Sequence, residues 1–93
     1  MIQTFASDET EHFYVTCQSR RLPADIHKRA AMRLNQLSAA TQIEDLRMPP
    51  SNRLEKLLGD REGQWSIRIN NQWRICFRFV GGHAFEVEII DYH

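Results

Sequence analysis

Apolar and polar residues alternate most regularly over residues 63–79, which read GQWSIRINNQWRICFRF. Successive side chains of a strand point to opposite faces, so this pattern predicts two half-buried strands. Asn70 and Asn71 separate the two runs, and asparagine tolerates the positive φ angles of tight hairpin turns. We therefore predict a hairpin turning at these two residues. Its apolar face would carry Trp65, Ile67, Ile69, Trp73, Ile75, Phe77 and Phe79.

The opposite face of the predicted hairpin is polar and should point away from the core. It carries Ser66, Arg68, Arg74, Cys76 and Arg78. Glu86 and Glu88 fall on the same face of the next predicted strand, so Arg68 and Arg78 are expected to pair with them across strands. Arg74 is less readily explained by such pairing, and arginine presents a planar fork that matches phosphate.

Three further segments are predicted to extend the sheet. Residues 84–90 repeat the alternation after a turn at residues 80–83, and Phe85, Val87 and Ile89 should share the apolar face. Residues 53–58 (RLEKLL) form a short run between a diproline and a Gly-Asp turn, and we place them as a strand. Residues 1–5 (MIQTF) are β-prone and could add another strand.

Helical spacing appears between these strands. Ser7 or Asp8 can cap a first helix, and Glu11 completes a capping-box pattern with Asp8. The apolar stripes of two helices are predicted to be Thr10, Phe13, Tyr14 and Cys17, and, after Pro23, Ile26, Ala30, Leu34 and Leu37. Thr41 and Glu44 repeat the capping-box spacing before a short turn around Ile43 and Leu46. This order predicts an α+β fold, with two N-terminal helices packed on a twisted antiparallel sheet of about four to five strands.

Composition agrees with one globular domain over residues 1–93. Hydrophobic residues make up 42% of the chain and aromatic residues 10%, which is too apolar for a disordered protein. No apolar run approaches the ~20 residues that span a bilayer, and the N-terminus lacks the pattern of a signal peptide. Cys17 and Cys76 are far apart, so free thiols and a cytoplasmic location are expected.

The formal net charge is zero, from 12 basic and 12 acidic residues, but the signs are unevenly distributed. Residues 20–36 hold five basic residues against the single acid Asp25; these are Arg20, Arg21, Lys28, Arg29 and Arg33. Such a segment could be an anion-binding face or a solvated helix surface, and the pattern leaves both possibilities open.

No common catalytic or metal-binding motif is present. The chain lacks a Gly-rich phosphate loop, an HExxH motif and a GxSxG elbow, and its four histidines are scattered. We therefore expect no metal and no cofactor.

The chain ends in Asp91, Tyr92 and His93, directly after a predicted strand. A tyrosine and a histidine near an arginine could together support RNA cleavage. That reaction needs a base for the 2′-hydroxyl, a cation for the phosphorane and an acid for the leaving 5′-oxygen. The pKa of histidine lies near neutrality, which suits proton transfer.

The run LLGDREGQWSIRINNQWRICFRF and the ending VEIIDYH resemble the HigB-like toxins of the RelE/ParE superfamily, in particular the HigB/GraT group. The likeness extends to the MIQTF opening and to the DLR-PP-NRLE connection. It implies a RelE-like fold and a bacterial type II toxin that cleaves mRNA on the translating ribosome. It also implies inhibition by a HigA-like antitoxin with a helix-turn-helix domain, so that operator DNA would be contacted only through the antitoxin.

The same resemblance assigns roles to residues of this chain. The functional arginine of the family falls on Arg74, and its terminal acid, tyrosine and histidine fall on Asp91, Tyr92 and His93. The chain departs from the family at two positions: Glu55 stands where many members have histidine, and Leu58 where many have lysine. Glu55 is expected to accept a proton instead. Lys56 would supply a nearby cation. For a toxin of this kind, we predict that the basic segment at residues 20–36 faces ribosomal RNA, and Lys56 and Arg61 join the residues expected to bind RNA or the ribosome.

Two other functions compete with mRNA cleavage. The ParE branch of the superfamily inhibits gyrase by binding it, without an enzymatic step. The Asp-Tyr-His ending argues against such a binder, which has no need of a terminal imidazole. A weakened toxin acting mainly as co-repressor with its antitoxin is the other alternative.

Overall fold

The computed structural model describes residues 1–91, which form two α-helices, four 3-10 helices and four β-strands. The α-helices are α1 (Asp8–Thr16) and α2 (His27–Ala39), and the strands are β1 (Glu55–Lys56), β2 (Trp65–Arg68), β3 (Trp73–Val80) and β4 (His83–Asp91). The 3-10 turns are η1 (Ala24–Ile26), η2 (Ile43–Arg47), η3 (Pro50–Asn52) and η4 (Gly59–Arg61).

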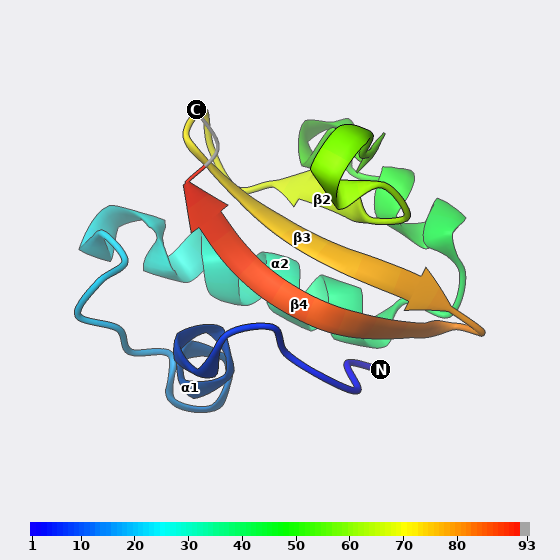
Figure 1. The fold of residues 1–93 in the computed structure, drawn as a ribbon. Coiled ribbons are helices and arrows are strands. Elements are labelled where there is room, and N and C mark those ends of the chain that lie inside the picture. Colours follow the sequence, from blue (N-terminus) through cyan, green and yellow to red (C-terminus); the bar gives the residue numbers. More distant parts are fainter. Residues whose placement is uncertain (92–93) are drawn as a thin grey trace.

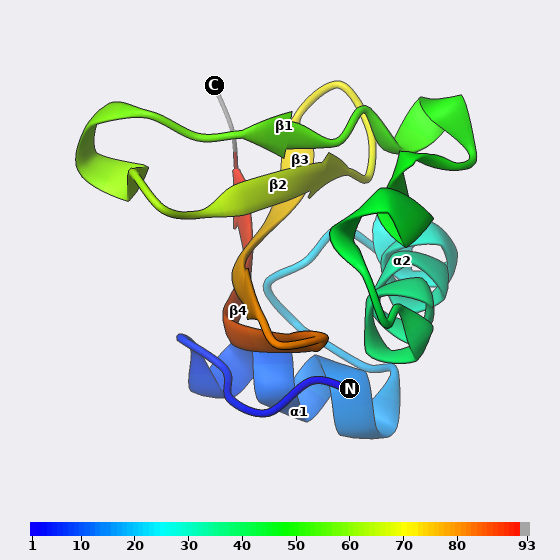
Figure 2. The same cartoon turned by 90° about the vertical axis from the view of Figure 1, so that its right-hand side faces the viewer.

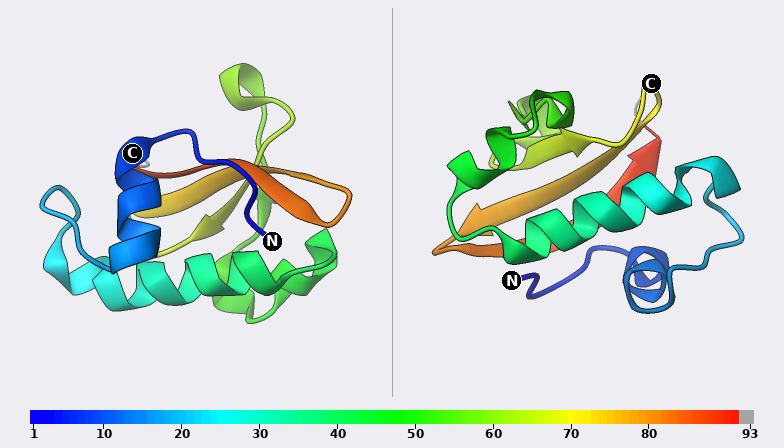
Figure 3. Two further views of the ribbon diagram at one scale, coloured as in Figure 1. Left: turned by 90° about the horizontal axis from the view of Figure 1, so that it is seen from below. Right: turned by 180° about the vertical axis from the view of Figure 1, so that it is seen from behind.

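The strands form an antiparallel sheet in the order β1-β2-β3-β4, and α2 lies along one face of it (Figures 1 and 3). The predicted stripe of α2 is buried there, because Ile26, Ala30, Leu34 and Leu37 are each no more than 3% exposed. They pack with Phe13, Leu46, Ile67, Ile75, Phe77 and Val87 in one core. The predicted α+β arrangement is thus confirmed.

The hairpin of β2 and β3 has the predicted faces but a different turn. Ile67 lies opposite Ile75, and Trp65 lies opposite Phe77. The turn is closed by a side chain, since Asn70 Oδ1 accepts hydrogen bonds from the backbone N–H groups of Gln72 and Trp73, both at 2.8 Å. Neither asparagine has a positive φ. The predicted two-residue turn was therefore wrong, because the asparagine closes the loop through its side chain.

A β-bulge changes which residues of β4 face the core. The register between β3 and β4 shifts after Cys76, and Glu86 on β4 has a φ of 53°. Ala84 and Val87 are consequently buried, while Phe85 lies opposite Arg78 on the outer face. The prediction that Phe85 shares the inner face was wrong, because the bulge reverses the alternation.

The polar face of the hairpin is also covered, contrary to prediction. Ser66 and Cys76 are fully buried, and Arg74 is only 8% exposed. β1 pairs with β2, and the connection through η4 crosses this outer face, away from α2 (Figure 2). The outer face is thus largely covered, and Arg74 is buried there beneath Arg53 and Glu55.

The N-terminal segment lies along the free edge of β4 without forming a strand. Ile2 and Phe5 make isolated parallel bridges to Ala84 and Val87. Further along the same edge, Thr10 Oγ1 on α1 accepts a hydrogen bond from Ile89 N at 3.0 Å. The predicted extra strand is therefore reduced to two bridges.

The first helix begins at one of its two predicted caps, whereas other predicted end positions differ. Ser7, and not Asp8, caps α1, because its hydroxyl accepts from Thr10 N at 3.1 Å. Cys17 is the exposed C-cap of α1 in the left-handed region, so it does not belong to the buried stripe. At η2 the capping box uses Gln42 and Asp45 in place of Thr41 and Glu44. The Asp45 carboxylate accepts hydrogen bonds from the backbone N–H groups of Thr41 and Gln42, at 2.9 and 3.1 Å, and these bonds lower its pKa.

Within residues 1–91, no helix has both the length and the apolar character needed to cross a membrane.

Candidate active site

Arg74, near the start of β3, is held in a defined position. Its Nη2 donates to the carbonyl of Arg53 at 2.7 Å, and its Nη1 lies 3.5 Å from a carboxylate oxygen of Glu55. Arg53 follows η3 and has a left-handed backbone, with φ 45° and ψ 56°. A guanidinium held by a backbone carbonyl and a carboxylate is oriented before any ligand binds.

A surface cleft of about 380 Å³ opens at this arginine. Its walls come from the residue after η3, from β1, β2 and β3, and from the β2–β3 loop. The lining residues are Arg53, Glu55, Arg68, Asn71 and Arg74. Arg68 and Arg74 are cross-strand neighbours in the hairpin. Of the lining residues, three are arginines and one is a carboxylate, so the cleft has the charge needed to bind an anion such as phosphate.

Glu55 and Lys56 form the whole of β1, so their side chains diverge to opposite faces. Glu55 points toward Arg74, as expected for a member of the same site. The Lys56 ammonium lies 5.8 Å from the ring centre of Trp65, in cation–π geometry. Lys56 is thus placed beside Trp65, while Glu55 lines the cleft.

Asp91 lies at the end of β4, opposite Trp73, whereas Arg74 lies opposite Ile90. Neighbouring strand positions face opposite ways, so Asp91 and Arg74 lie on different faces of the sheet. The Asp91 carboxylate accepts a hydrogen bond from Gln72 Nε2 at 3.0 Å, which ties the end of β4 to the β2–β3 loop. Tyr92 and His93, the two other terminal residues predicted for the site, lie outside the described residues.

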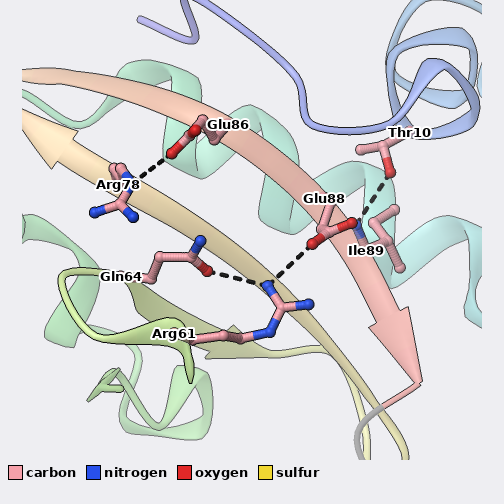
Figure 4. Close-up of polar contacts among 7 residues, drawn as sticks. All are labelled: Thr10, Arg61, Gln64, Arg78, Glu86, Glu88 and Ile89. Carbon is pink, nitrogen blue, oxygen red and sulfur yellow. Dashed lines mark hydrogen bonds and ion pairs between the residues drawn. The ribbon is translucent and has the colours of Figure 1, made fainter. Parts of the chain in front are cut away.

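Arg61, predicted to bind RNA, instead joins η4 to β4 (Figure 4). Its Nη1 lies 3.0 Å from Glu88 Oε1 and 3.1 Å from Gln64 Oε1. Arg78 pairs with Glu86 on the same face. The expected pairing is thus confirmed for Arg78. Glu88 pairs with Arg61 and not with Arg68, because Arg68 lies on β2, which is separated from β4 by β3.

Cys76 lies opposite Glu88, the partner of Arg61, and is fully buried. Burial raises the pKa of its thiol, and the nearby Arg61 only partly offsets that effect. A buried thiol with a raised pKa is a poor nucleophile, so Cys76 belongs to the packing of the outer face.

Lys28 and Arg29 are exposed on α2, as the predicted basic surface requires. They line a second cleft, of about 420 Å³, together with Asp25, Ile26, Met32, Ile69 and Asn70. Asn70 belongs to the same loop as Asn71, which lines the cleft at Arg74. The basic face of α2 and the arginine cleft therefore flank one loop.

The remaining predicted basic residues differ in their surroundings. Arg20 is exposed, and Arg21 lies 3.0 Å from Glu9 with its own side chain 84% exposed. Arg33 is buried, with Nε donating to the Arg68 carbonyl at 3.1 Å and Nη2 to Ser51 Oγ at 3.3 Å. Burial lowers its pKa, and Arg29 lowers it further. Arg33 is thus a structural residue and does not belong to an RNA-binding surface.

In residues 1–91, no group of three or more histidine, cysteine, aspartate or glutamate side chains could share a metal ion. The side chains that line the cleft are better suited to binding a phosphate directly than through a bridging cation.

A sequence profile described as "RelE-like toxin of type II toxin-antitoxin system HigB" matches residues 3–93. The chain belongs to the HigB-like toxin family. It is 40% identical to Toxin HigB-1 of Vibrio cholerae over 85 residues, covering 90% of each chain. It is 34% identical to Endoribonuclease HigB of Proteus vulgaris over 93 residues, covering 100% of both chains.

Solved structures share the fold of this HigB-like toxin. The toxin–antitoxin complex YoeB-YefM from Staphylococcus aureus aligns with a TM-score of 0.63 at 18% identity, covering 100% of this chain and 98% of the matched chain. YafQ from E. coli aligns with a TM-score of 0.59 at 11% identity, covering 98% and 91% of the two chains. The arrangement of helices and sheet is therefore that of the RelE-like toxins.

Sequence reasoning missed three residues that line the cleft of this HigB-like toxin: Arg53, Arg68 and Asn71. Arg68 carried a signal, because alternation puts it on the face of Arg74. Arg53 carried none, since its place depends on a left-handed backbone that nothing in the residue type indicates.

Proposed function

We propose that this HigB-like toxin is a metal-independent endoribonuclease that cleaves mRNA on the translating ribosome. The observation that carries the proposal is the cleft in which Arg74, held by the Arg53 carbonyl, faces Glu55 among further arginines. The name of the Proteus vulgaris relative supports the endoribonuclease activity.

The reaction is a transesterification at one phosphodiester. The 2′-oxygen forms a bond to phosphorus while the bond to the 5′-oxygen breaks, so that a 2′,3′-cyclic phosphate and a 5′-hydroxyl end result. Glu55 accepts the proton of the 2′-hydroxyl, and its carboxylate is half exposed at the cleft, where a substrate can reach it. Arg74 stabilises the negative charge that develops on the phosphorane oxygens.

The leaving 5′-oxygen needs a proton, which we assign to Tyr92 and His93. They follow Asp91 in the sequence, and β4 ends beside the first residue of β3, next to Arg74. Asp91 acts as a positioning residue, because its hydrogen bond to Gln72 fixes the end of β4 against the β2–β3 loop.

Two kinds of partner belong to this proposal. The exposed Lys28 and Arg29, with Arg20, would contact ribosomal RNA through phosphates. A HigA-like antitoxin would inhibit the toxin, as the toxin–antitoxin family and the YoeB-YefM complexes suggest.

Mapping mRNA 5′ ends after a brief pulse of expression tests the function. Wild-type protein should produce cuts within translated frames, and Arg74→Gln should reduce them by roughly 10² or more. Arg78→Gln is the matched control, because it removes the same charge further along β3 and should cut normally. The absence of cuts with the wild-type protein, or equal cutting by Arg74→Gln, would contradict the proposal.

Arg74→Gln needs a folding check, since the side chain is buried. Losing a charged hydrogen bond to a backbone carbonyl costs about 1.5 to 3 kcal/mol. The loss of cleavage should therefore be measured at a temperature at which circular dichroism shows the variant folded.

A further inference from the structure

The cleft holds more positive charge than a single reacting phosphate accounts for. We assign the phosphorane to Arg74, yet Arg53 and Arg68 line the same cleft. Among the described residues that line it, Glu55 is the one carboxylate, and it lies near Arg74. Two guanidinium groups are left for another negative charge.

Arg68 is held against the wall of the cleft. It lies directly opposite Arg74, and like charges in such cross-strand pairs are destabilising. Its Nε nevertheless donates to the Asn70 carbonyl at 3.0 Å, and its Nη2 donates to Asn71 Oδ1. The β2–β3 loop thus keeps this guanidinium beside Arg74, where solvent alone would favour separation.

Arg53 contributes to the cleft through two different groups. Its backbone carbonyl orients Arg74, while its exposed side chain lines the cleft. None of the hydrogen bonds or ion pairs described for residues 1–91 uses the Arg53 guanidinium. That side chain can therefore bind an anion without breaking an interaction within the protein.

We propose that Arg53 and Arg68 form a second phosphate-binding position, which holds the phosphodiester next to the one at Arg74. This inference rests on the proposed function for its ligand, an RNA strand. Guanidinium groups match phosphate oxygens in a bidentate manner, so two of them in one cleft fix the direction of the backbone. Holding the neighbouring phosphodiester limits the freedom of the reacting one and favours in-line attack by the 2′-oxygen.

The two arginines can be replaced without disturbing Arg74. Arg53→Asn suits the left-handed backbone, since asparagine tolerates positive φ, and it keeps the carbonyl that Arg74 uses. Arg68→Gln removes the second charge. Arg47→Gln is the matched control, because Arg47 is exposed in η2 and does not line the cleft.

The probe is an RNA hexanucleotide methylated at every 2′-oxygen, which cannot undergo transesterification. Its affinity is measured by fluorescence anisotropy at several low salt concentrations. Each cleft variant should bind about tenfold more weakly than wild type, as expected for the removal of a charged hydrogen bond. The slope of log K against log salt should become shallower by about 0.7 for each phosphate that the variant no longer neutralises.

The control decides whether the effect is local. Arg47→Gln should bind the hexanucleotide like the wild-type protein. The proposal is overturned if the wild-type protein does not bind the probe, if the cleft variants bind like wild type, or if Arg47→Gln weakens binding equally.

Cleavage of mRNA on ribosomes is measured separately. Normal cleavage with unaltered probe binding would refute the second position alone, and weakened probe binding without wild-type cleavage would refute the proposed function alone.

Discussion

Arg29 and Arg33 lie one helical turn apart on α2, but their surroundings differ. Arg29 is exposed and makes one long contact, of 3.5 Å, to the Ile69 carbonyl. Arg33 is 4% exposed and donates to both the Arg68 carbonyl and Ser51. Arg33 thus joins α2 to β2 and η3. Through the carbonyl of Arg68, it also fixes the backbone of a residue that lines the cleft.

We predict that Arg33→Met lowers the free energy of unfolding by about 1 to 3 kcal/mol, because the Arg68 carbonyl and Ser51 lose a charged donor. Urea denaturation followed by circular dichroism measures the change. Arg29→Met is the control and should change stability by less than about 0.5 kcal/mol, since its side chain is on the surface. Equal effects of the two substitutions would show that Arg33 is not structural.

Residue type and spacing could have revealed part of this difference. Arg33 falls seven positions after Ile26 and one before Leu34, within the predicted buried stripe of α2. The burial of Arg74 could not be predicted in this way. It depends on η3 and β1, which are about 20 residues away in the sequence and whose position follows from the tertiary fold.

At the scale of elements, alternation predicted the β2–β3 hairpin because both strands keep a strict period of two. It failed in β4, where the Glu86 bulge inserts an extra residue. Such bulges often carry glycine, but here a glutamate adopts the positive φ, so the sequence contained no warning. The short β1 was predicted from its flanking turns, yet only Glu55 and Lys56 pair as a strand.

The exposed face of α2 leads to a second prediction. Lys28→Glu and Arg29→Glu should each weaken binding to ribosomes and flatten its salt dependence, because each removes a cation and adds an anion beside the RNA. Binding is measured at several salt concentrations, and thermal melts verify the fold.

Arg47→Glu provides the matched reversal for this surface. It changes the net charge equally at an exposed position of η2, so it should affect binding less than either helix substitution. Equal weakening by all three variants would mean that overall charge, and not this face, governs binding.

At the scale of the molecule, the core is complete within the described residues. Along the sequence, the large side chains that are fully buried run from Phe13 to Val87. β4 pairs with β3 as far as Asp91. We therefore predict that the chemistry assigned to Tyr92 and His93 can be separated from folding.

Removing Tyr92 and His93 should abolish mRNA cleavage, because no acid remains for the leaving 5′-oxygen. The melting temperature should stay within a few degrees of the wild-type value, and antitoxin binding should be retained. The point variants Tyr92→Phe and His93→Gln divide the effect between the two side chains. Wild-type cleavage by the shortened protein would disprove their assignment as acids.

The edge of β4 also determines how molecules of this protein can associate. The backbone of Met1, Gln3, Thr4 and Ala6 exchanges hydrogen bonds with Ala84 and Val87, and the hydroxyls of Thr4 and Thr10 take the N–H groups of Glu86 and Ile89. An unpaired sheet edge is a template for aggregation and strand exchange. Because the protein's own N-terminal segment fills this one, two copies cannot join their sheets through β4 unless residues 1–6 first detach.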